Sequence, residues 1–158
     1  MNRPDFRVGI PAGILAATAT SGALIAIGAR ASTPARPFNI IAGHLLGVQR
    51  GDVYGFVPSV TITGIALHIL LTTLMALAVA FVARRWFTPA WVAALAITTL
   101  SALVSIGIAR RGGSSLARLL AVGDLLLFYV VLAIALVVGL RLAFFDAPTD
   151  RSRPIDQM

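Results

Sequence analysis

The sequence predicts an all-α fold: a polytopic transmembrane four-helix bundle with a short interfacial or re-entrant helix between spans 1 and 2. The 158 residues are 58% hydrophobic and only 12% charged, and the mean hydropathy is +0.92. Soluble domains carry about twice that share of charged residues. Four apolar stretches each reach or exceed the roughly 20 residues that cross a hydrocarbon core about 30 Å thick. We therefore expect residues 1–158 to form a single integral membrane domain.

The first span is expected over residues 8–29. Small residues recur every four positions in it and form a ridge on which another helix can pack closely. The residues of this ridge are Gly9, Gly13, Ala17 and Ser21. A cleaved signal peptide is the competing interpretation, because Ala29, Arg30 and Ala31 have the form of a cleavage site. The apolar region is longer than that of an ordinary signal peptide, which favours a span.

The connector to the second span contains an apolar stretch at residues 38–48, about half the length needed to cross a membrane. Such a length is typical of an interfacial or re-entrant helix. Pro37 precedes the stretch and Gly47 lies near its end, as expected for helix termini. Arg36 and Arg50 flank it at headgroup level.

The second span, residues 57–83, contains no charge and stops at Arg84 and Arg85. Its polar and small residues recur at spacings of three and four, so they share one helix face. These residues are Thr61, Gly64, His68 and Thr72, with Met75 continuing the stripe. We expect this face to point into the bundle and the leucine-rich face to point at lipid.

The third and fourth spans are expected over residues 90–109 and 116–145, followed by a polar tail at 146–158. The turn before the third span is short, so the second and third spans form an antiparallel hairpin. Thr98, Ser101 and Ser105 share one face of the third span. Asp124 lies within the fourth span, and Arg141 near its end can extend to the interface.

Polar residues from all four spans are expected at a similar depth and form an intramembrane polar layer. His68 and Asp124 lie roughly 15 Å and 12 Å from the same side. An intramembrane acid needs a partner, and we expect His68 to be that partner, with Arg118 as a second candidate. The layer consists of His68, Asp124, Thr61, Thr72, Ser101, Ser105, Thr20 and Ser21, with His44, Asn39 and Arg118 as secondary candidates.

The layer admits three functions. Its side chains can simply hydrogen-bond across helices and fix the packing. They can alternatively carry protons or a small solute, with His68 and Asp124 as coupling groups. A haem held by two histidines, or a bound quinone, is the third possibility. We expect no cofactor and no metal, since there is no cysteine and no cluster of acids with ligand spacing. Hydrolytic and nucleotide-binding motifs are absent from the sequence.

The net charge of +7 comes from thirteen arginines against six aspartates. Because the arginines lie between apolar spans, they indicate anchoring to the lipid bilayer and not binding of nucleic acid. Seven lie on the side of the termini and six on the other, so the positive-inside rule discriminates weakly. Their density in short segments favours a multi-pass protein of the cell membrane with both termini cytoplasmic.

The stretch PFNIIAGHLLG, followed by TITGIALH at residues 61–68, resembles small, uncharacterised bacterial four-helix membrane proteins. In these proteins an asparagine and a histidine precede the second span, and a Gly-x-x-x-His lies within it. The resemblance implies the same fold and a bacterial inner membrane, and it implies no activity.

We expect a non-enzymatic small integral membrane protein, either a free-standing bundle or a structural or accessory subunit of a membrane complex. The ridge on the first span offers a surface for another membrane subunit or for a second copy of the chain. The alternative functions are a proton-coupled transporter or channel using His68 and Asp124 and, third, a haem- or quinone-binding subunit.

Overall fold

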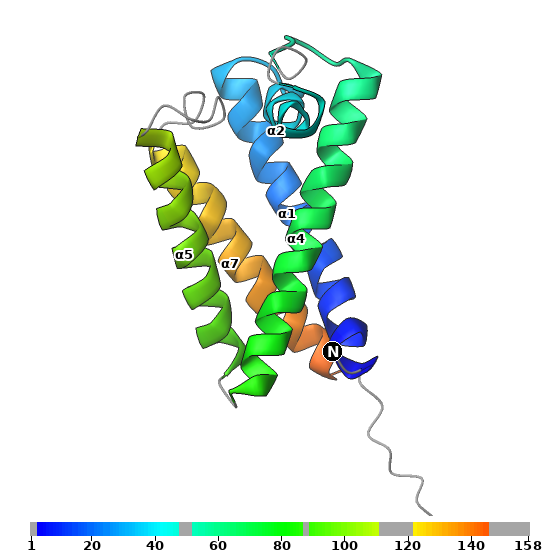
Figure 1. Cartoon of the computed structure of the whole chain (residues 1–158), viewed down its shortest axis with the longest axis vertical. Coiled ribbons are helices and arrows are strands. Elements are labelled where there is room, and N and C mark those ends of the chain that lie inside the picture. The colour runs from blue at the N-terminus through cyan, green and yellow to red at the C-terminus, as the bar shows by residue number, and fades with distance from the viewer. Residues whose placement is uncertain (1–2, 48–51, 87–88, 111–121, 146–158) are drawn as a thin grey trace, which may run out of the picture.

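The structure is a computed structural model that describes residues 3–47, 52–86, 89–110 and 122–145. These residues form five α-helices and no strand (Figure 1). The helices are α1 (Arg3–Ala31), α2 (Arg36–Leu46), α4 (Pro58–Arg85), α5 (Ala90–Arg110) and α7 (Val122–Phe145). The all-α prediction is confirmed for the described residues. The expected tail at 146–158 and the expected fourth-span residues 116–121 lie outside them.

Four of these helices are long and apolar enough to cross a membrane, as the sequence predicts. The candidate spans are Phe6–Ala31, Pro58–Arg85, Ala90–Gly107 and Val122–Ala143. The first helix begins earlier than expected, at Arg3, and Pro11 lies inside it. The second begins with Pro58, whose fixed φ suits the first turn of a helix.

Helix α1 packs against both α4 and α7, while α5 packs against α7 and α4. The beginning of α1 and the end of α7 lie at the same end of the molecule (Figure 1). This arrangement follows from an even number of antiparallel spans joined end to end. The C-terminal end of α1 therefore lies at the same level as the beginning of α4 and of α7.

Small residues allow α1 to approach its two neighbours closely. A Cβ added at Gly13 would lie 2.5 Å from the Thr73 Cα, and one added at Gly139 would lie 2.9 Å from the Ala12 Cα. Gly9 is similarly close to Leu77 of α4. At Gly9 and Gly13 the predicted ridge on α1 is thus covered by α4 of the same chain. A partner subunit could reach these two positions only by displacing α4.

The hydrophobic core consists mainly of alanines, with a few larger residues between them. Its buried members include Ala12, Ala16, Ala76, Ala80, Ala94, Val79, Leu132, Leu136 and Leu140. Alanine side chains let helix backbones come close, and interhelical van der Waals contact drives association inside a membrane. The core therefore lies along the seam where α1, α4 and α7 meet, with α5 adding Ala93 and Ala94.

The short helix α2 packs on α4 and α1 near the C-terminal end of α1. In Figure 1 it is seen nearly end-on, so its axis runs across those of the spans. The backbone of Phe38 in α2 touches α4 at Gly64, where a Cβ would overlap the Phe38 carbonyl. The absence of a side chain at Gly64 thus allows α2 to pack directly on α4. The helix is two residues offset from the expected 38–48.

Candidate functional site

The polar stripe of α4 points into the protein, as its spacing predicts. Thr61, Gly64, His68 and Thr72 are all buried, and Met75 packs against the core. The stripe contacts three other helices. Its first two residues meet α2, and His68 meets α1, α2 and α7.

His68 is 4% exposed, and among the described residues its polar side-chain partner is Thr20 of α1. The His68 Nε2 lies 2.9 Å from the Thr20 Oγ1, and the same oxygen lies 2.7 Å from the Ala16 carbonyl. A hydroxyl has a single proton to donate. Both contacts are satisfied when Thr20 donates to Ala16 and His68 donates from Nε2. The imidazole therefore acts as a donor that ties α4 to α1.

Two aromatic rings enclose the His68 ring. The Phe38 ring packs edge-on at 6.1 Å between centroids, and the Phe128 ring of α7 lies tilted at the same distance. Phe128 in turn meets Tyr129, whose hydroxyl lies 2.6 Å from the Ser105 Oγ of α5. One connected layer thus runs from α1 through α4 and α7 to α5.

Asp124 does not pair directly with His68, so that expectation is wrong. Its carboxylate forms an ion pair with Arg30, near the C-terminal end of α1. The physical reason is depth. Asp124 lies in the first turn of α7, at the end of the spans where α1 finishes, and not well inside the bundle. The extension of α1 to Ala31 brings a guanidinium to this level.

The remaining hydroxyls of the expected layer mostly bond to their own helix. Thr72 donates to the His68 carbonyl at 2.8 Å, Thr98 to the Ala94 carbonyl at 2.7 Å, and Ser101 to the Ile97 carbonyl at 2.8 Å. Ser21 is half-buried. Such bonds satisfy a hydroxyl locally and leave it little chemistry of its own. Arg118 lies outside the described residues.

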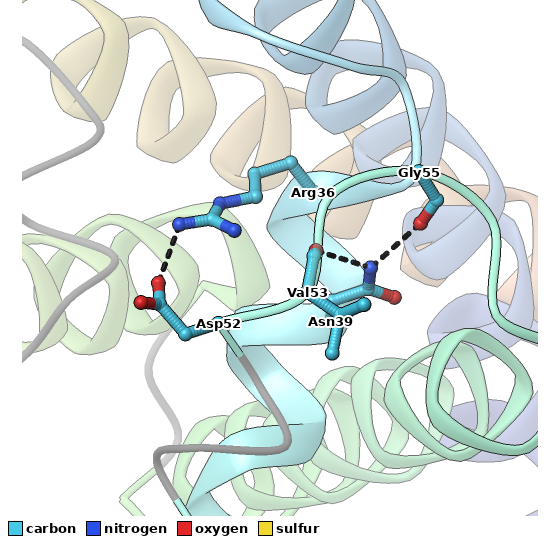
Figure 2. A network of polar contacts seen from close by, with 5 residues as sticks. All are labelled: Arg36, Asn39, Asp52, Val53 and Gly55. Carbon is cyan, nitrogen blue, oxygen red and sulfur yellow. Dashed lines mark hydrogen bonds and ion pairs between the residues drawn. The ribbon is translucent and has the colours of Figure 1, made fainter.

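Asn39 forms the most extensive hydrogen-bonded junction in the described part of the chain (Figure 2). It is completely buried, and its amide donates to the carbonyls of Val53 and Gly55 at 3.0 and 2.9 Å. Its Oδ1 accepts a hydrogen bond from the Thr61 hydroxyl at 2.7 Å. One side chain thereby fastens α2 to the loop before α4 and to α4 itself.

Arg36, which is also on α2, holds the same loop through Asp52 (Figure 2). Its Nη2 donates to the Asp52 carboxylate at 2.5 Å, and its guanidinium lies 4.0 Å from the centre of the Tyr54 ring. Arginine over an aromatic face is a favourable cation–π contact. Arg36 is only 6% exposed, whereas Asp52 and Tyr54 are exposed. Residues 52–55 of the connector are therefore held against α2 as a folded cap over one end of the bundle.

The two histidines occupy different settings. His44 is exposed on α2, and its Nδ1 donates to the Ile40 carbonyl at 3.0 Å, while His68 is buried against Thr20. Within the described ranges, no three histidine, cysteine, aspartate or glutamate side chains gather as metal ligands.

The sequence pattern does not indicate several residues of the site. Phe38, Phe128 and Tyr129 are ordinary apolar residues in the sequence, and no spacing distinguishes them from lipid-facing neighbours. Arg30 and Arg36 are expected only as headgroup anchors. The presence of Asp52 and Tyr54 in the connector is the one signal that could have indicated partners for Arg36.

The four apolar helices fit a small multi-pass integral membrane protein. Comparison with protein-family models, with curated proteins and with solved structures finds no match.

Proposed function

We propose that this chain is a non-enzymatic integral membrane protein that serves as a structural or accessory subunit of a membrane complex. The observation that carries the proposal is the setting of His68. Its Nε2 is bonded to Thr20 and its ring is enclosed by Phe38 and Phe128. A side chain held in this way supports packing of α1, α2, α4 and α7 against one another. The Asp124–Arg30 pair likewise ties α7 to α1.

Coverage of α5 supports a role as a subunit. In its most apolar window, 22% of the residues are buried by the described chain, against 33–39% for the other three spans. Leu100 and Leu103 are among its exposed residues. Because α5 is the least covered span, we infer that it is the surface on which a neighbouring subunit packs.

Photocrosslinking tests this role, because a benzophenone side chain inserts into C–H bonds and needs no reactive group on its partner. The benzophenone residue replaces Leu100 on α5 or Leu71 on α4, two largely exposed leucines. We expect irradiation of native membranes to link the α5 variant to another protein and to leave the α4 variant unlinked. Mass spectrometry identifies the linked protein. An unlinked monomer for both variants would contradict the subunit role and favour a free-standing bundle.

We also infer that α2 lies at the membrane interface and that both termini are cytoplasmic. Arg36 pairs with the exposed Asp52 and packs on Tyr54. Arginine and tyrosine are residue types that concentrate at the level of the headgroups. The dense arginines near the N-terminus and at Arg84 and Arg85 favour the cytoplasmic side for the opposite end of the bundle.

An impermeant maleimide applied to intact cells tests both inferences. His44→Cys on α2 should react, because its position is exposed and lies at the end of the bundle opposite the termini. The mid-span Leu71→Cys variant should remain unlabelled in cells and in lysates. Labelling of His44→Cys only after lysis would reverse the orientation. Its protection under both conditions would place α2 within the hydrocarbon region.

A further inference from the structure

A cavity of about 370 Å³ lies between the C-terminal part of α1, the turn that leads into α2, and the beginning of α4. Its wall is almost entirely apolar and includes Ile25, Pro34, Phe38, Phe56 and Ile65. Ile25 and Phe56 are exposed, so the cavity opens on the outer surface of the bundle. Its volume is within the range of small-molecule sites, which are mostly apolar with a few polar groups.

Two threonine hydroxyls belong to the residues of this wall, and they differ in their hydrogen bonds. Thr61 donates to the Asn39 Oδ1 and accepts from the Val57 amide at 3.2 Å. The Thr33 Oγ1 is buried and has no hydrogen-bond partner in the part of the chain that the structure describes. A buried hydroxyl without a partner is unfavourable, so a group that accepts its proton would stabilise this side chain. Because the cavity surface is almost entirely apolar, the hydroxyl must turn about χ1 toward the cavity to meet such a group.

The place of the cavity in the fold limits what can fill it. It lies at the end of the spans, beside the cap that Arg36, Asp52 and Tyr54 form. With α2 at the membrane interface, as inferred above, this is the level just below the headgroups, where acyl chains begin. An occupant needs an apolar chain and, near its upper end, a carbonyl oxygen that carries no charge.

We propose that the cavity binds the upper part of a glycerolipid acyl chain, with the ester carbonyl accepting a hydrogen bond from Thr33. The methylenes next to the ester then occupy the apolar wall formed by Ile25, Phe38 and Ile65. The proposal rests on the cavity, on the unpaired hydroxyl and on the interfacial position inferred above for α2. It does not depend on whether the protein is an accessory subunit.

The hydrogen bond to Thr33 can be isolated with two probe lipids, a diester phosphatidylcholine and its diether analogue of equal chain length. The diether lacks the ester carbonyls and is otherwise matched. Native mass spectrometry of the delipidated, purified protein measures the apparent Kd for each. We expect the unmodified chain to bind the diester about three- to tenfold more tightly, the effect of one ordinary hydrogen bond.

Thr33→Val should abolish the difference between the two lipids, because valine has nearly the same shape and no hydroxyl. Thr18→Val is the matched control, since Thr18 is an exposed α1 threonine that donates to its own helix at the Ile14 carbonyl. This control should retain the preference for the diester. Equal binding of the two lipids by the unmodified chain would overturn the proposal.

Filling the cavity provides an independent measurement. Ile65→Trp should reduce the amount of co-purified glycerolipid at least severalfold, whereas Ile69→Trp, one turn further along α4 and outside the cavity wall, should not. Thermal unfolding verifies that both variants are folded, and Thr33→Val tests the same site without added bulk. Co-purification of a quinone that Ile65→Trp removes would overturn the glycerolipid assignment.

Discussion

Replacing Gly64 by alanine is expected to destabilise the protein by about 3 kcal/mol, near the upper end of the cost of overpacking. The added Cβ would overlap the carbonyl of Phe38. That carbonyl belongs to the backbone of α2, so the clash cannot be relieved by a change of rotamer. Either α2 moves away from α4, which breaks the Asn39–Thr61 bond, or α4 bends.

The free energy of unfolding, measured by denaturant titration in mixed micelles, checks this expectation. Gly22→Ala is the matched control, because a Cβ at Gly22 meets nothing within 4 Å. In the middle of α1 this control should leave stability unchanged or raise it by up to about 1 kcal/mol, since alanine is the better helix former. If Gly64→Ala were as harmless as Gly22→Ala, α2 could not be docked on α4 as described.

Asn39→Ala is expected to have a similarly large effect, a loss of about 3 kcal/mol. It leaves the Thr61 hydroxyl and the carbonyls of Val53 and Gly55 without their side-chain partner. Each unpaired buried group costs about 1–3 kcal/mol. We take a total near the lower end of the sum, because the loop lies at the end of the bundle, where water can replace part of what is lost.

Hydrogen exchange over residues 53–57, together with the unfolding titration, measures this loss. Thr61→Val is the matched comparison, since it removes the hydroxyl from the same junction and leaves both bonds from Asn39 to the loop. It should cost about 1 kcal/mol and speed exchange of the Val57 amide, which loses its bond to the Thr61 hydroxyl, while exchange at residues 53–56 stays nearly unchanged. Equal effects of the two substitutions would mean that the bonds to Val53 and Gly55 contribute little.

The four spans and the inward face of α4 could be predicted because they depend on composition and helical period. Spans differ from soluble helices in length and charge, and the polar stripe from Thr61 to Thr72 marks one face. The faces of the other spans are harder to assign. Inside a bilayer the core and the lipid are both apolar, so exposed Leu100 and buried Leu136 look alike in the sequence.

The partner of Asp124 could not be predicted because it depends on where helices end. Counting residues from an assumed helix start placed Asp124 at the depth of His68. In the structure α1 ends later, at Ala31, and Asp124 lies in the first turn of α7. Asp124 therefore lies opposite Arg30 instead. Helix boundaries are the least certain part of a sequence prediction, and the identity of this pair follows directly from them.

The first and the last spans of the chain are direct neighbours, and this has a consequence for biosynthesis. Gly139 of α7 meets Ala12 of α1, and Asp124 meets Arg30, so the two helices are fastened along much of their length. When α1 enters the membrane, the helix that covers this face has not yet been translated. Pairing of α1 with α4 can form early, but the bundle closes only when the ribosome has released α7 into the bilayer.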